Sequence, residues 1–140
     1  MRKSNPPSRV VPDRARAGES SRGRPDVIVE FLFDRGCFLI SVNNIGNGPA
    51  LKVAVQFDKK ITSPDGKKEL TALPLFKNIE FLGPNREIVA FVDASSSYFR
   101  RKQPTKISTQ VTYRDINGEM YELSIKHDLE IYRELPYPNV

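Results

Sequence analysis

The sequence predicts an all-β domain built as an antiparallel β-sandwich, and two kinds of observation support this fold class. From residue 27 onward apolar residues recur with a period of two, and no long window keeps the 3.6-residue spacing of an amphipathic helix. Clusters of Gly, Pro, Asn and Asp interrupt this pattern every 8 to 12 residues or so, which is typical of about seven short strands joined by turns.

The first strand is expected at residues 27–33, and Asp34-Arg35-Gly36 is a turn into a second strand, Cys37 to Ile45. The segment Asn43 to Ala50 (NNIGNGPA) follows, with two glycines and a proline that allow the chain to reverse or to switch sheets. A third strand, Leu51 to Phe57, comes next. We expect these three strands to form a meander.

The middle of the chain is less regular. Residues 70–76 fit a short edge strand interrupted by Pro74, and Gly83-Pro84-Asn85 fits a turn before a strand at residues 87–93. Residues 94–101 fit either one helical turn or a long loop. The sequence therefore leaves the pairing of these segments open.

The last two strands form the clearest hairpin. Lys106 to Arg114 alternates strongly, and Asn117-Gly118 is the dipeptide preferred in two-residue hairpin turns. The partner strand is expected from Met120 to Arg133, with Ile125, Leu129 and Ile131 among its inward residues. This long last strand is the best candidate for an exposed sheet edge through which the protein could form an oligomer.

The number of strands and the spacing of turns favour an immunoglobulin-like sandwich. The alternative is a five-stranded oligonucleotide-binding barrel, which the strand count and the lack of a clear helix between its third and fourth strands argue against.

Residues 42–57 also carry a family resemblance. Val42 to Ala50, followed by the alternating Val53, Val55 and Phe57, resembles bacterial immunoglobulin-like modules of the cell-adhesion-related type. Leu82-Gly83-Pro84-Asn85 resembles their Leu-x-Pro-Gly turn with the glycine displaced. The chain is also similar to uncharacterised bacterial N-x-G-N-G-P-A sandwich proteins, in which the sandwich follows a membrane anchor. This resemblance implies a fold and assigns no functional residue.

The charge is concentrated at the amino end. Residues 1–25 hold seven basic and two acidic side chains, a net charge of +5, whereas the remaining 115 residues hold 15 of each sign. This segment is also rich in proline and poor in aliphatic residues, so we expect a disordered Arg/Pro/Ser-rich tail at residues 1–25. The sandwich is expected at residues 26–135, with a short C-terminal tail at residues 136–140.

The composition limits which cellular compartment and which cofactors are expected. One cysteine excludes an intrachain disulfide, and no apolar run is long enough for a membrane-spanning helix or the core of a signal peptide. We therefore expect a cytoplasmic protein without a metal or other cofactor, because one Cys and one His are a poor ligand set for zinc.

Catalytic residues are not expected. His127 falls on the inward side of its strand, where a histidine hydrogen-bonded to the backbone is the favoured interpretation over a catalytic base. Cys37 is interpreted as a packed structural thiol. Ser95-Ser96-Ser97 lacks the Gly-x-Ser-x-Gly elbow of a nucleophilic serine.

Two segments are candidates for binding. The first combines aromatic and cationic residues that could stack on a base or contact an acidic partner, although such aromatics more often anchor a loop: Tyr98, Phe99, Arg100, Arg101 and Lys102. The second is the tail, whose arginines could bind phosphates: Arg9, Arg14, Arg16, Arg22 and Arg24. The alternative for the tail is a linker or a contact with an acidic protein surface.

We therefore expect a non-enzymatic interaction or assembly module that recognises a protein partner through its surface. The alternative is a nucleic-acid-associated or capsid-like assembly protein that uses its basic arm. That alternative predicts binding to arbitrary DNA or RNA at low salt, lost when residues 1–25 are deleted. A hydrolase that depends on His127 is the least favoured hypothesis.

Overall fold

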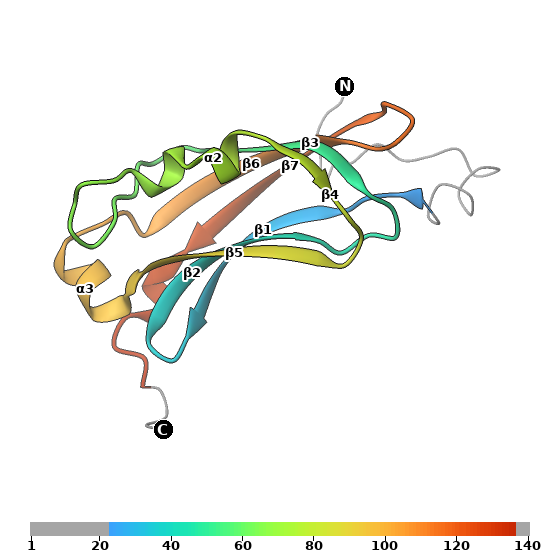
Figure 1. Ribbon diagram of the computed structural model, residues 1–140. Helices are drawn as coiled ribbons and strands as arrows, with labels where there is room; N and C mark the ends of the chain where they lie inside the picture. Colours follow the sequence, from blue (N-terminus) through green and yellow to red (C-terminus); the bar gives the residue numbers. More distant parts are fainter. Residues whose placement is uncertain (1–22, 137–140) are drawn as a thin grey trace.

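A computed structural model describes residues 23–136 of the chain and gives an all-β fold, with seven strands in two antiparallel sheets (Figure 1). The strands are β1 (Val27–Asp34), β2 (Cys37–Asn44), β3 (Ala50–Phe57), β4 (Ile79–Leu82), β5 (Arg86–Ala94), β6 (Lys106–Arg114) and β7 (Met120–Asp128). The short helices are η2 (Leu70–Ala72), α2 (Pro74–Lys77), α3 (Ser95–Arg100) and η3 (Leu129–Tyr132).

The two sheets pack against one another as two layers. The three-stranded sheet has the order β1-β2-β5, and the four-stranded sheet has the order β4-β3-β6-β7. Alternate residues of each strand point into the space between the sheets, as the period of two predicts. The buried core formed there includes Val29, Phe38, Ile40, Val53, Ile61, Phe76, Tyr98, Ile107, Val111, Tyr113 and Leu129.

The segment that joins β2 to β3 carries the chain from one sheet to the other. β2 pairs with β1 and β5, whereas β3 pairs with β4 and β6. The expected meander of the first three strands is therefore wrong, and the option of a sheet switch is the one observed. Strand periodicity cannot distinguish the two, because both arrangements bury the same alternate residues.

Asn44 holds this crossing together from a fully buried position. Its Oδ1 accepts hydrogen bonds from the backbone N–H groups of Asp26 and Gly46, both at 3.0 Å. Its Nδ2 donates to the carbonyl oxygens of Gly48 at 2.8 Å and Leu82 at 3.0 Å. One amide therefore ties the start of β1, the crossing turn and the end of β4 to one another.

The tight turns agree with the sequence analysis. Arg35 and Gly36 both have positive φ, at 51° and 78°, in the turn between β1 and β2. The hairpin at Asn117-Gly118 is confirmed, with Gly118 at φ 84°, but its loop spans residues 115–119 rather than two residues. Gly46 is needed for another reason, since a Cβ there would lie 2.4 Å from the carbonyl oxygen of Arg24.

Two predicted elements differ from the structure. The edge strand expected at residues 70–76 is replaced by η2 and α2, because Pro74 occupies the first turn of α2, where its missing N–H costs nothing. The last strand ends at Asp128 rather than at residue 133, because the Asp128 carboxylate accepts a hydrogen bond from the Glu130 N–H and starts η3. Ile131, expected to point inward, is 66% exposed.

Candidate interaction surface

Tyr98, the first residue of the predicted aromatic and cationic segment, belongs to the core. It lies on α3 and is completely buried, with its ring edge-on to Phe38 at a centroid distance of 5.2 Å. Its hydroxyl donates to the carbonyl oxygen of Pro104, and burial raises its pKa. Tyr98 therefore anchors the segment to the sandwich.

Arg101 is held in an ion pair. Its Nε and Nη2 both donate to Oδ2 of Asp93, at 3.1 and 3.0 Å, and its Nη1 and Nη2 donate to the hydroxyl and carbonyl oxygens of Thr62, both at 3.0 Å. The Asp93 side chain is only 4% exposed. This guanidinium joins β5 to the loop before η2, so its donors are used within the fold.

The remaining residues of this segment differ in exposure. Phe99 is partly buried, and the guanidinium of Arg133 lies over its ring at 4.3 Å from the centroid. Arg100 and Lys102 are exposed. The structure therefore leaves Arg100 and Lys102 facing solvent, while Tyr98, Phe99 and Arg101 make contacts within the domain.

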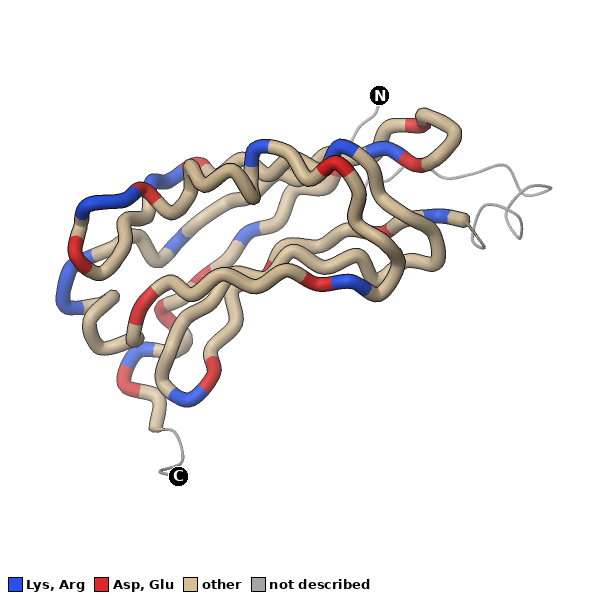
Figure 2. Tube along the Cα trace, in the orientation of Figure 1, with Lys and Arg blue, Asp and Glu red and all other residues tan. Residues whose placement is uncertain are grey.

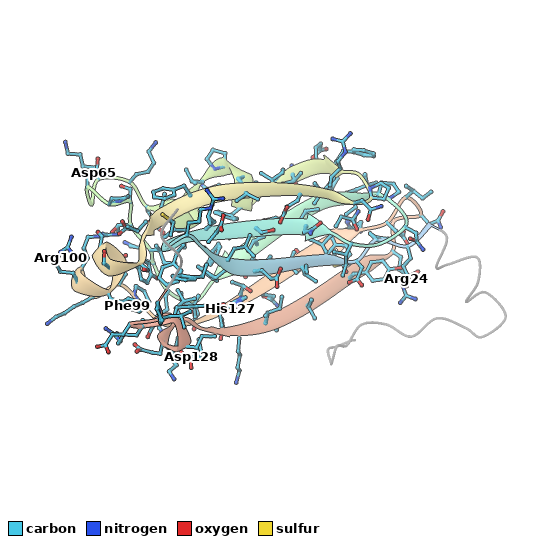
Figure 3. The ribbon with its side chains drawn as sticks, turned by 90° about the horizontal axis from the view of Figure 1, so that it is seen from below. Arg24, Asp65, Phe99, Arg100, His127 and Asp128 are labelled. Carbon is cyan, nitrogen blue, oxygen red and sulfur yellow. The ribbon has the colours of Figure 1, made fainter. Side chains whose placement is uncertain are left out.

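Among the arginines of the tail that were predicted to bind, only Arg24 falls within the described part of the chain. Its guanidinium lies 5.6 Å from the centroid of the Tyr121 ring, and its carbonyl oxygen accepts hydrogen bonds from the N–H groups of Asn47 and Gly48. Figure 3 shows Arg24 and Arg100 at opposite ends of the domain. The structure does not describe Arg9, Arg14, Arg16 and Arg22, which lie outside residues 23–136.

His127 points into the space between the sheets, as predicted. Its partner is a side chain rather than the backbone, because Nε2 lies 2.9 Å from Oγ1 of Thr109. The ring also packs edge-on against Phe31 at a centroid distance of 5.0 Å. Thr109 is 2% exposed, so its hydroxyl is not accessible to a substrate and the pair has the character of a core contact.

Burial lowers the pKa of His127 below its ordinary value, so the folded state favours the neutral ring. The unfolded chain then takes up this proton first as the pH falls through about 6.5. We expect the contribution of His127 to stability to be complete above that pH and to decrease below it. Urea unfolding between pH 5 and 8 should show that His127→Gln removes this part of the pH dependence, whereas parallel curves for both proteins would contradict the expectation.

The other residues considered as nucleophiles are Cys37 and the serines of residues 95–97. Cys37 lies partly exposed on the outward side of β2, and Ser95 to Ser97 form the first turn of α3. Within residues 23–136, no group of three or more His, Cys, Asp or Glu side chains is arranged to hold a metal ion.

A depression of about 530 Å³ lies between β3 and the η2 and α2 segment. It is open to solvent and has mixed charge at its rim. Lys60 lies 3.9 Å from Glu69, and Lys59 donates to the carbonyl oxygen of Lys106. No single charge dominates this depression, so its chemistry does not select one class of ligand.

The outward side of the β1-β2-β5 sheet is a second candidate surface. Figure 3, which looks at the domain of Figure 1 from below, shows this side of the sheet. The register places outward residues in rows across the strands, with Leu32 beside Leu39 and Leu39 beside Phe91. Val89 and Phe91 are 44% and 54% exposed. We call this surface the β1-β2-β5 face, and its outward residues are Ile28, Glu30, Leu32, Asp34, Cys37, Leu39, Ser41, Asn43, Glu87, Val89 and Phe91.

The opposite outer surface is polar over β6 and β7. Gln110 donates to Glu122 across the two strands, and Lys106 pairs with Asp128 at 3.3 Å. Ser108, Thr112 and Ser124 complete these rows with polar side chains. The outward side of β6 and β7 therefore has the polar residues that a solvated sheet face normally carries, whereas Phe81 of β4, which pairs with Leu51, is 63% exposed.

The strand edges also differ from one another. β4 has four residues, and β7 carries Glu122, Lys126 and Asp128 on its outward side, two features that discourage pairing with another chain. β5 pairs with β2 within the described residues, and between Glu87 and Asp93 it has five consecutive apolar residues. Figure 2 shows this stretch as an uncharged trace bounded by charged residues.

The sequence contained part of the signal for this surface. The alternation of Ile88, Ala90 and Val92 with Val89 and Phe91 makes both sides of the strand apolar, a pattern typical of a strand covered on both faces. The structure covers one face and leaves the other open. The last strand, expected as the exposed edge, is indeed an edge, but it is the charged one.

The described residues thus form an all-β domain of two packed antiparallel sheets, with exposed apolar residues on the β1-β2-β5 face. Residues 3–133 match the family model described as "Domain of unknown function (DUF8453)", and the chain belongs to this family. No match was found among curated proteins or among solved structures. Among the helices of residues 23–136, none is long and apolar enough to cross a membrane.

Proposed function

We propose that this protein is a non-enzymatic, immunoglobulin-like interaction module that binds a protein partner through its β1-β2-β5 face. The strand order supports the immunoglobulin-like assignment. β1, β2 and β5 correspond to strands A, B and E of such domains, and β3, β6 and β7 correspond to C, F and G. β4 pairs with β3 in the position of strand C′.

The observation that supports the binding function is the apolar row on this face, in which Leu32 and Leu39 are partly exposed and Phe91 is exposed. Leu39 lies between Leu32 and Phe91, and Phe91 is more than half exposed. Contiguous exposed apolar side chains rimmed by polar residues are characteristic of protein-interaction sites. Glu30 and Glu87 supply such a rim, and Glu87 accepts a hydrogen bond from the buried Ser41 hydroxyl.

The test is site-specific photo-crosslinking in cells of the source organism. A benzophenone amino acid replaces Phe91 in the full chain, and a control protein carries it at Ser124, an exposed outward position on β7. We expect a discrete adduct from position 91 that an excess of the unmodified protein suppresses. A competitor with Val89→Lys and Leu39→Lys should not suppress it. Equal adducts from both positions, or none from position 91, would reject this function.

A further inference from the structure

The edge of β5 offers hydrogen-bonding groups as well as apolar side chains. One side of the strand pairs with β2, and the backbone groups on its other side face away from the sheet. Residues 86–89 and Phe91 are all exposed. An extended segment placed beside β5 could therefore continue the sheet as a fourth strand.

The side chains of β5 define what such a strand must carry. Val89 and Phe91 project outward, and Ile88 and Ala90 project toward the other sheet. Ile88 is 36% exposed at this edge. An added strand would consequently meet apolar neighbours on both of its sides over the middle of β5.

Charge restricts the partner further. The outward positions of β1, β2 and β5 include three carboxylates, those of Glu30, Asp34 and Glu87, and no Lys or Arg. A second copy added at this edge would bring the same carboxylates to the shared outward face and no outward cation to pair with them. Like charges gathered on one face repel one another, so the charge favours a cationic partner strand over a second copy.

We propose that β5 binds an extended, Lys- or Arg-containing segment of a partner protein by strand addition. This inference rests on the proposed function and adds the chemistry of the partner. Backbone hydrogen bonds along β5 supply affinity. Apolar side chains of the segment pack beside Ile88 on the inward side, and its cations lie on the outward side near the carboxylates of the β1-β2-β5 face.

The experiment measures binding of a fluorescent decapeptide of five Val-Lys repeats to the full chain by anisotropy. We expect saturable binding that weakens at least tenfold with Val89→Lys. The matched variant Ser124→Lys, which adds the same charge at an exposed position on the edge strand β7, should change it less than twofold. A Val-Glu decapeptide, and a Val-Lys decapeptide with alternate backbone nitrogens methylated, should each bind at least tenfold more weakly.

Three outcomes would overturn the inference. Equal binding to the Val89→Lys variant would place the peptide elsewhere, equal binding of the methylated peptide would exclude strand addition, and equal binding of the Val-Glu peptide would exclude the charge argument. Sedimentation of the full chain should give a monomer, and a dimer that Val89→Lys dissociates would assign the edge to a second copy. If the peptide fails while crosslinking from position 91 succeeds, strand addition fails and the proposed function stands.

Discussion

Replacement of Asn44 by alanine is expected to destabilise the domain by about 3 kcal/mol or more, because four buried or partly buried polar groups would lose their hydrogen bonds to it together. These groups are the N–H groups of Asp26 and Gly46 and the carbonyl oxygens of Gly48 and Leu82. Alanine can neither donate nor accept in their place, and the position is fully buried. Urea unfolding followed by circular dichroism would show a large decrease in the midpoint.

The neighbouring Asn43 provides the matched control. It lies on the outward side of β2 and is partly exposed, so Asn43→Ala should change the free energy of unfolding by no more than about 0.5 kcal/mol. Similar losses in the two variants would mean that the Asn44 amide does not hold the crossing together.

Replacement of Arg101 by alanine is expected to destabilise the protein by about 3 to 5 kcal/mol, because it leaves the Asp93 carboxylate buried without its cation. The Asp93 side chain is 4% exposed, and that of Arg101 is 19% exposed. The variant also removes the bonds from Arg101 to Thr62. Thermal and urea unfolding should both report the loss.

Arg100→Ala is the control for this prediction, since Arg100 is adjacent in sequence and exposed. We expect a change within about 0.5 kcal/mol for that variant. Arg101→Lys should be intermediate, because an ammonium keeps the charge but cannot reproduce the several bonds of the planar guanidinium. If Arg101→Ala were as stable as Arg100→Ala, the pair with Asp93 would not be structural.

The strands themselves were largely predictable, because each depends on local alternation and on turn residues. Lys106–Arg114 has the predicted bounds, and the Asn117-Gly118 turn lies where its dipeptide indicates. The pairing of strands was not predictable in the same way. β2 pairs with β5 across more than forty residues, and nothing local to Asn44 or Arg86 specifies that contact.

The interaction surface was harder to predict for a related reason. Val89 and Phe91 alternate with Ile88 and Ala90, but alternation does not say which side is covered or whether the strand is an edge. The ion pair of Arg101 was also difficult to predict. It resembled a solvated cation in the sequence, and only the turn of α3 brings it back to Asp93.

The most direct measurement of the central claim is residue-resolved amide hydrogen exchange in the dilute full chain, with and without the Val-Lys decapeptide. Along residues 87–91 the N–H groups bonded to β2 should be protected, and the alternate ones facing away should exchange rapidly. The peptide should protect the second set and leave β7 unchanged. Continuous protection of β5 in the free protein, or no change there on adding peptide, would contradict an open binding edge.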